Sequence, residues 1–157
     1  MTSAAAHSLN SRGEGGLASR RPVIHEKRIE IRWRDVDAYQ HVNNAVYATY
    51  LEECRDEWLA CTLGAAGDVW DFVLARLAID FRRELRLDDD AVVVSCRLAR
   101  IGSASVTVRE EVRTLVGAPA AKSEAVLVAR DRTSGRSRPL SDAERAAFER
   151  SAGNVPA

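Results

Sequence analysis

The sequence predicts a single α+β domain in which one long helix lies on an antiparallel sheet. One strand-like segment precedes a strongly helical apolar pattern, and four more strand-like segments follow it. The length of 157 residues is that of one domain, and it allows a sizeable buried core. No internal repeat suggests a second unit, so we expect one folded domain over residues 23–150.

The long helix is predicted by apolar residues that recur at steps of three and four. Asn43 or Asn44 can cap its N-terminus with a side-chain oxygen, and Gly64 is well placed to end it. The apolar positions are Val46, Tyr47, Tyr50, Leu51, Cys54, Trp58 and Cys61, and the polar side consists of Glu52, Glu53, Arg55, Asp56 and Glu57. Such large apolar residues indicate a helix that is covered by something broad, such as a sheet.

The five strands are predicted by alternation of apolar and polar residues. The expected buried positions are Ile29, Ile31 and Trp33 in the first strand, Val73, Ala75, Leu77, Ile79 and Phe81 in the second, and Val92, Val94, Cys96 and Leu98 in the third, over residues 91–101. Gly102 permits a reversal into a strand over residues 103–115, and a turn at 116–119 leads into one over 120–131. Ser141 has the spacing of a capping box for a short C-terminal helix.

Composition excludes several classes of function. The chain has 23 basic and 23 acidic residues and therefore no net charge, so nucleic-acid binding is not expected. It shows neither a signal peptide nor an 18-residue apolar run, which predicts a cytoplasmic protein without a membrane segment. Residues 1–22 contain few large apolar groups, and we expect them to form a disordered tail.

The cysteines and the acidic triplet do not indicate a metal site. The three cysteines are odd in number and form no CxxC pair, so neither a disulfide framework nor a zinc site is expected. Cys54 and Cys61 lie seven residues apart in the helical pattern and are interpreted as buried thiols. Asp88, Asp89 and Asp90 have no second cluster of ligands and are interpreted as a turn.

A polar segment between the first strand and the long helix carries the candidate chemistry. It contains Asp35, Asp37, His41, Asn43 and Asn44. A carboxylate before a helix can be only a helix cap. The unpaired N–H groups of a helix N-terminus can also hold a developing oxyanion, while a carboxylate attacks a thioester or activates a water. Both interpretations stay open from the pattern alone.

The same segment resembles a known family. Residues 33–47 read WRDVDAYQHVNNAVY, residues 50–55 read YLEECR, and further matches are VLAR at 73–76, IDF at 79–81 and SGRSRPL at 134–140. Together they are similar to the 4-hydroxybenzoyl-CoA thioesterase-like family of hotdog-fold acyl-CoA thioesterases. The resemblance covers about residues 24–148 and is specific for the family rather than for a substrate.

The resemblance implies a fold, an assembly and a site. A five-stranded antiparallel sheet wraps around the long helix, and subunits pair edge to edge in a homodimer or homotetramer with each site at the interface. Asp37 matches the catalytic acid, as general base or nucleophile, and the backbone N–H near Asn44 matches the oxyanion donor; the role of Asp35 is less clearly chemical. The substrate is an acyl-CoA or acyl-carrier-protein thioester, and neither a metal nor a cofactor is required.

Some positions depart from the family pattern and leave alternatives. His41 matches a catalytic histidine of plant acyl-carrier-protein thioesterases, but it can instead orient the loop. Gln40 stands where many relatives carry Gly, and Tyr39 stands where the plant enzymes use Asn. Another branch of the fold places its acid on the long helix, where Glu52 and Glu53 are the alternatives. A non-catalytic acyl-CoA-binding protein of this fold is the main rival function, and the substrate-binding residues and the acyl chain are not identified by the sequence.

Overall fold

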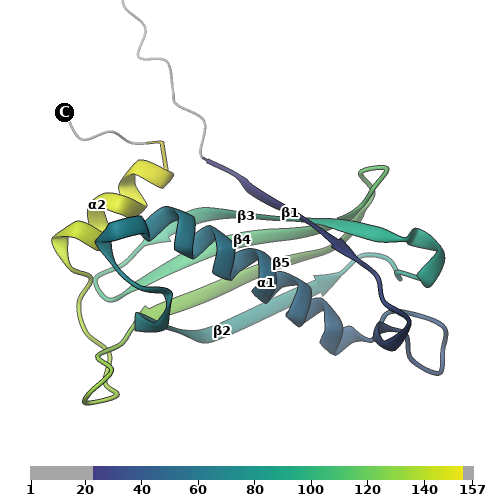
Figure 1. Cartoon of the computed structure of the whole chain (residues 1–157), viewed down its shortest axis with the longest axis horizontal. Coiled ribbons are helices and arrows are strands. Elements are labelled where there is room, and N and C mark those ends of the chain that lie inside the picture. The colour runs from purple at the N-terminus through teal and green to yellow at the C-terminus, as the bar shows by residue number, and fades with distance from the viewer. Residues whose placement is uncertain (1–22, 154–157) are drawn as a thin grey trace, which may run out of the picture.

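A computed structural model describes residues 23–153 as a five-stranded antiparallel sheet crossed by one long helix (Figure 1). The strands are β1 (His25–Glu30), β2 (Phe72–Phe81), β3 (Ala91–Ile101), β4 (Ser105–Thr114) and β5 (Pro119–Ala129), and the helices are α1 (Asn44–Leu63) and α2 (Asp142–Ser151). Their order across the sheet is β1-β3-β4-β5-β2, so β1 and β2 are its edges. The predicted α+β hotdog fold is therefore confirmed, whereas the expected tail at residues 1–22 lies outside the described part.

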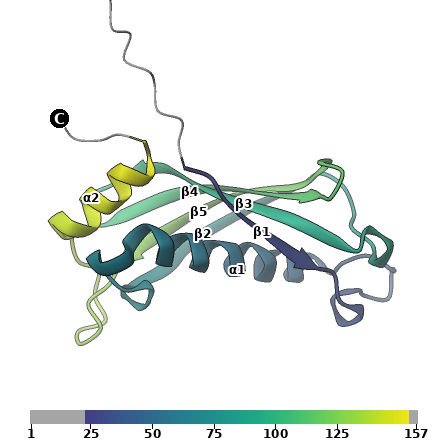
Figure 2. The same cartoon turned by 45° about the horizontal axis from the view of Figure 1, so that its top comes forward.

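The two helices cover one face of the sheet, with α1 along its length and α2 at one end (Figure 2). Phe148 of α2 packs against Trp58 of α1 and Phe72 of β2, with ring centroids 6.0 and 5.7 Å apart. The capping box that Ser141 predicted opens α2, because its hydroxyl accepts from the Glu144 N–H. Within residues 23–153, no helix combines the length and the apolar character needed to cross a bilayer.

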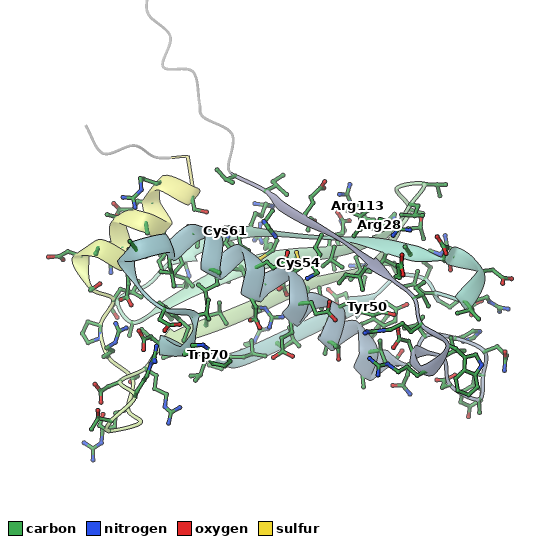
Figure 3. All side chains as sticks on the ribbon, in the orientation of Figure 1. Arg28, Tyr50, Cys54, Cys61, Trp70 and Arg113 are labelled. Carbon is green, nitrogen blue, oxygen red and sulfur yellow. The ribbon has the colours of Figure 1, made fainter. Side chains whose placement is uncertain are left out.

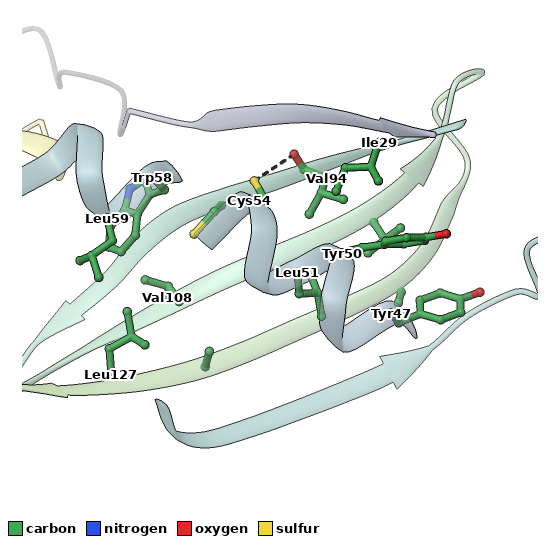
Figure 4. Close-up of a cluster of buried hydrophobic side chains, with 14 of the residues drawn as sticks. Ile29, Tyr47, Tyr50, Leu51, Cys54, Trp58, Leu59, Val94, Val108 and Leu127 are labelled. Atoms are coloured by element: carbon green, nitrogen blue, oxygen red, sulfur yellow. Dashed lines mark hydrogen bonds between the residues drawn. The ribbon is translucent and has the colours of Figure 1, made fainter. Parts of the chain in front are cut away.

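Helix α1 begins and ends where the sequence predicts. The Asn43 side chain accepts a hydrogen bond from the Ala45 N–H at 2.9 Å, and Gly64 ends the helix with a φ of 51°. Its buried side chains are Tyr47, Tyr50, Leu51, Cys54, Arg55, Trp58, Leu59 and Leu63. Figure 4 shows side chains of this set, among them Leu51, Trp58 and Leu59, next to the strands, with the Cys54 thiol donating to the Val94 carbonyl.

The expected burial of Cys61 is wrong, because that thiol is exposed while Cys54 is buried. The two are labelled along α1 in Figure 3. The buried stripe advances in steps of four residues, from Leu51 through Arg55 and Leu59 to Leu63. Cys61 lies two residues from both Leu59 and Leu63, which places it about 160° around a helix of 3.6 residues per turn and on the side away from the sheet.

Strand β3 has the predicted bounds, but the faces of two other strands differ from expectation. β1 ends at Glu30, and Trp33 starts a 3₁₀ turn (Trp33–Asp35) in which it is 83% exposed. In β2 the pairing with β5 shifts between Leu74 and Arg76, which leaves Ala75 as a bulge. One extra residue reverses the alternation, so Phe72 and Leu74 face the core side together with the later apolar residues, in place of Val73 and Ala75.

The core contains one ion pair that the sequence pattern assigned to solvent. Arg55 of α1 is 2% exposed, and its Nε and Nη2 donate to the Glu110 carboxylate of β4 at 2.8 and 3.3 Å. The Ser123 hydroxyl donates to the same carboxylate at 2.9 Å. The prediction that Arg55 lies on the polar side is therefore wrong, because a buried partner 55 positions later accommodates its charge.

Candidate active site

The polar segment between β1 and α1 folds into a small closed turn. Val36 and Val42 form an isolated antiparallel bridge. Inside it, the Asp37 N–H donates to the His41 carbonyl at 2.9 Å, and the Gln40 N–H donates to the Asp37 carbonyl at 3.0 Å. These bonds bring Asp37 and His41, which are four positions apart, directly opposite each other.

The turn requires a left-handed residue at position 40. Gln40 has a φ of 65°, a conformation in which glycine carries no Cβ penalty. This geometry explains in physical terms why Gly suits this position in many members of the family that the motif resembles. Gln40 therefore adopts a backbone conformation that costs a residue with a Cβ more than it costs glycine.

Asp35 anchors the turn to the helix and belongs to the structural framework. It is 4% exposed, and its Oδ2 accepts from the Tyr50 hydroxyl at 2.7 Å and from the Arg32 N–H at 2.9 Å. Burial alone would raise the pKa of Asp35, but the hydrogen bonds from Tyr50 and Arg32 hold that pKa below its usual value. Its carbonyl accepts from the Asn43 N–H at 2.8 Å, directly before the helix.

Asp37 is not the helix cap, since Asn43 fills that position. Its Oδ1 accepts from the Tyr39 N–H at 2.9 Å, which is the local bond of an Asx turn. Among residues 23–153 no donor approaches the second carboxylate oxygen within hydrogen-bond distance. The carboxylate is thus held at one oxygen and available at the other.

Asn44 supplies an unpaired donor at the first position of α1. Its backbone N–H has no hydrogen-bond partner in the described part of the chain. A cleft of about 300 Å³ adjoins it, and its walls are His41, Val42, Asn44, Tyr47, Phe81, Arg82, Arg83 and Glu84. The positive end of the helix dipole and a free N–H therefore border this cleft, where they can stabilise an oxyanion.

His41 is held in the cleft by residues that the sequence analysis missed. Its Nε2 lies 2.9 Å from Glu84 Oε2 and 3.2 Å from Arg86 Nη2. Glu84 and Arg86 follow β2 and are more than forty positions away from His41 in the chain. The only signal in the sequence is the charged run Arg82-Arg83-Glu84, which directly follows the apolar residue Phe81.

The inner wall of the cleft is aromatic. Tyr47 packs edge-on against Phe81 with centroids 5.1 Å apart, and its hydroxyl donates to the Arg83 carbonyl at 3.2 Å. Burial raises the pKa of Tyr47 to about 12, so this phenol stays neutral and contributes packing rather than basicity. The helical pattern predicts Tyr47 as an apolar position, and the residue is both buried and part of the cleft wall.

The structure thus places two of the three predicted site residues in the lining of the cleft. His41 and Asn44 line the cleft, whereas Asp37 lies next to it in the turn and is not one of its lining residues. Glu52 and Glu53, the alternative acids, do not line the cleft either, and Glu53 pairs with Lys27 and Arg32 at 3.8 Å. Among residues 23–153 no group of three His, Cys, Asp or Glu side chains is arranged to hold a metal ion.

Comparisons with solved structures agree with this architecture. A thioesterase from Thermus thermophilus, complexed with coenzyme A and Zn, is 32% identical with a TM-score of 0.74, over 84% of this chain and 96% of that one. The PA2801 protein from Pseudomonas aeruginosa is 30% identical with a TM-score of 0.67, over 79% and 97% of the two chains. A Bacillus stearothermophilus structure at 22% identity and a TM-score of 0.71, over 85% and 100%, supports the fold alone.

A family model provides the assignment. No match was found among curated protein sequences. The model of the thioesterase-like superfamily matches residues 31–148, which is more than half of the chain and includes the closed turn, α1 and all strands except β1. The family resemblance seen in the sequence is confirmed, and the chain belongs to the thioesterase-like superfamily.

Proposed function

We propose that this chain hydrolyses acyl-CoA thioesters, with Asp37 as the general base or nucleophile. The observation that carries the proposal is the free Asn44 N–H at the edge of a cleft, next to a turn that presents one unengaged oxygen of Asp37. When a thioester carbonyl oxygen binds at the Asn44 N–H, the carbonyl carbon becomes more electrophilic. The reason is that the N–H and the helix dipole stabilise the negative charge that develops on the oxygen.

The reaction follows from these two groups. In the general-base form, Asp37 takes a proton from water while the water oxygen bonds to the carbonyl carbon. The carbon–sulfur bond then breaks, the thiolate leaves and takes up the proton, and the acid is released. In the nucleophilic form, the Asp37 carboxylate attacks the carbon itself, the carbon–sulfur bond breaks and the thiolate leaves. Water then opens the resulting anhydride, which releases the acid and frees the Asp37 carboxylate, and the thiolate takes up the proton that this water gives. Both forms use the same oxyanion donor.

Coenzyme A is the carrier that the comparisons support best. The Thermus thermophilus thioesterase, at 32% identity, is complexed with coenzyme A. The cleft of about 300 Å³ is at the lower end of ligand pockets, which are roughly 300–1,000 Å³, and an extended pantetheine arm needs little width. An acyl-carrier-protein thioester remains the alternative substrate, and the cytoplasmic location stays a prediction.

The assay that tests this function measures free thiol released from a panel of short, long and aromatic acyl-CoA substrates. We expect at least one to be hydrolysed with a kcat/KM above about 10⁴ M⁻¹s⁻¹, the lower end for enzymes acting on their own substrates. Saturable binding of acyl-CoA without thiol release would identify a binding protein in place of an enzyme. Release only from acyl-carrier-protein thioesters would keep the chemistry and change the carrier.

We also propose that a second copy completes the site along β2. Asp37 does not line the cleft of the single chain, and β2 is an edge strand whose backbone is unpaired on one side. That edge exposes Val73, Leu74 and Phe81, which are 38%, 44% and 46% accessible, and Phe81 continues into the cleft. A partner at this edge would cover apolar surface and the open side of the cleft together.

Sedimentation velocity at micromolar concentration should therefore give a dimer or a tetramer. Val73→Glu, on the face of β2 away from the core, should shift the protein toward monomer and lower activity in parallel, because it places a charge on the paired edge. Ile24→Glu is the matched control, since Ile24 precedes β1 at the opposite edge and is 55% exposed. A wild-type monomer with full activity would refute the interfacial site.

A further inference from the structure

We infer that a depression on the outer face of the sheet binds a phosphate group, which the guanidinium groups of Arg97 and Arg109 hold between them. Both helices cover the opposite face and leave this one open (Figure 2). The depression has a volume of about 660 Å³, against about 300 Å³ for the candidate active-site cleft, and all five strands contribute to its wall. It shares no lining residue with that cleft, so it is a separate site.

The strand register places two arginines side by side on this face. Arg97 of β3 lies directly opposite Arg109 of β4, and both line the depression. Their neighbours Cys96 and Glu110 are buried on the helix side, where Glu110 binds Arg55, so alternation along each strand directs both arginines outward. Like charges directly opposite each other in an antiparallel pair destabilise the sheet. An anion bound between the two side chains would replace this repulsion by two attractive contacts.

The carboxylates on the same face are engaged by other cations. The pairs are Arg76 with Glu124 at 3.0 Å, Arg113 with Glu26, Lys122 with Glu111 at 4.0 Å, and Arg82 with Asp80 at 3.7 Å. Within residues 23–153, Arg97 and Arg109 form neither an ion pair nor a side-chain hydrogen bond. The depression therefore contains two positive charges that no acid of the described chain neutralises.

A phosphate group suits these side chains better than a carboxylate does. It carries close to two negative charges at neutral pH and has three strong acceptor oxygens, so it can bind both guanidinium forks and offset both charges. Ser95 lines the same depression two positions before Arg97, and its hydroxyl can donate a further hydrogen bond. The volume of about 660 Å³ lies within the range of ligand pockets, roughly 300–1,000 Å³, which leaves room for a phosphorylated small molecule.

Calorimetric titration of the full chain with inorganic phosphate tests the site without any thioester. It is carried out at constant ionic strength and a pH of about 8, where phosphate is mainly a dianion. We expect saturable binding whose Kd is at least about tenfold weaker in Arg97→Gln and in Arg109→Gln, because each loses a charge-assisted hydrogen bond. Arg100→Gln is the matched control, since Arg100 is an exposed arginine of the same strand outside the depression, and it should bind phosphate like the wild type.

Thermal unfolding gives a second measurement in which the order of the proteins reverses. Without phosphate, Arg97→Gln should melt about 1–3 °C above the wild type, because the repulsion from Arg109 is removed. With saturating phosphate the wild type should melt higher than the variant, because binding to the folded state stabilises it. Sodium chloride at the same ionic strength is the reference, since it screens the repulsion without bridging the two side chains.

Titrations with AMP and adenosine identify the source of the phosphate. Tighter binding of AMP than of inorganic phosphate would indicate a phosphorylated small molecule, and equal binding would indicate free phosphate. Equal binding of AMP and adenosine, no saturable phosphate binding by the wild type, or a loss in Arg100→Gln equal to that in Arg97→Gln would overturn the inference. A smaller assembly in Arg97→Gln, with no phosphate binding by the wild type, would also overturn it and assign this face to contact between copies. None of these measurements depends on thioester hydrolysis, so failure of the proposed function would leave their outcome unchanged.

Discussion

Asp37→Asn should lower kcat by at least about a hundredfold while the melting temperature stays near that of the wild type. Asn keeps a side-chain oxygen that can accept from the Tyr39 N–H, so the local Asx turn is preserved. What the substitution removes is the negative charge and the basicity. Because Asn43 and not Asp37 caps α1, the helix itself is unaffected.

The loss of kcat in Asp37→Asn has to be compared with the effect of the same type of substitution at a site away from the cleft. Asp88→Asn removes the same charge from an exposed turn and should change kcat by less than about twofold, as surface substitutions away from special features do little. Thiol release, circular dichroism and thermal unfolding would be measured on all three proteins. Near-wild-type hydrolysis by Asp37→Asn would refute the mechanism, and Glu52 and Glu53 would become the next acids to test.

The sequence was sufficient wherever structure depends on local pattern. Strand β3 has the predicted bounds because its alternating apolar residues pack on one face against α1. The Asn43 cap, the Gly64 terminus and the Ser141 capping box were predictable because each depends on backbone groups within a few residues. The same holds for the helix N-terminus that presents the Asn44 N–H.

Three of the failures depend on contacts that are distant in the chain. Arg55 reads as a surface charge until Glu110 is known to face it, and that acid lies in the middle of β4. The bulge at Ala75 is fixed by the register with β5, so alternation within β2 alone cannot reveal it. Cys61 is exposed because the buried stripe of α1 rotates along the sheet.

The residues of the site also differ in whether the local sequence could predict them. His41 and Asn44 belong to one contiguous motif, and the structure places both in the cleft. Glu84 has no motif and is recognisable only once the loop after β2 is seen beside the turn. The sequence also left the function of His41 open between chemistry and loop orientation, and the structure places its ring at the cleft, with Nε2 2.9 Å from Glu84 Oε2.

Arg55→Met should lower the free energy of unfolding by about 3–5 kcal/mol at neutral pH, because it leaves a buried charge without its partner. Glu110 has no exposed side-chain surface, so removing its cation leaves a carboxylate that only Ser123 can stabilise. Met fills most of the volume of the arginine stem, which keeps the cavity cost small. Urea denaturation monitored by tryptophan fluorescence measures the loss.

The origin of that loss can be identified through pH and through a double variant. Burial raises the pKa of Glu110 even beside Arg55, and without that cation the pKa should rise further. A folded-state pKa above the unfolded value means that the folded state binds more protons in the window between the two, so the stability of Arg55→Met should increase as pH falls toward about 5. Arg55→Met combined with Glu110→Leu should recover most of the stability, because no charge is then left in the core. A double variant as unstable as Arg55→Met alone would instead attribute the loss to packing between α1 and β4.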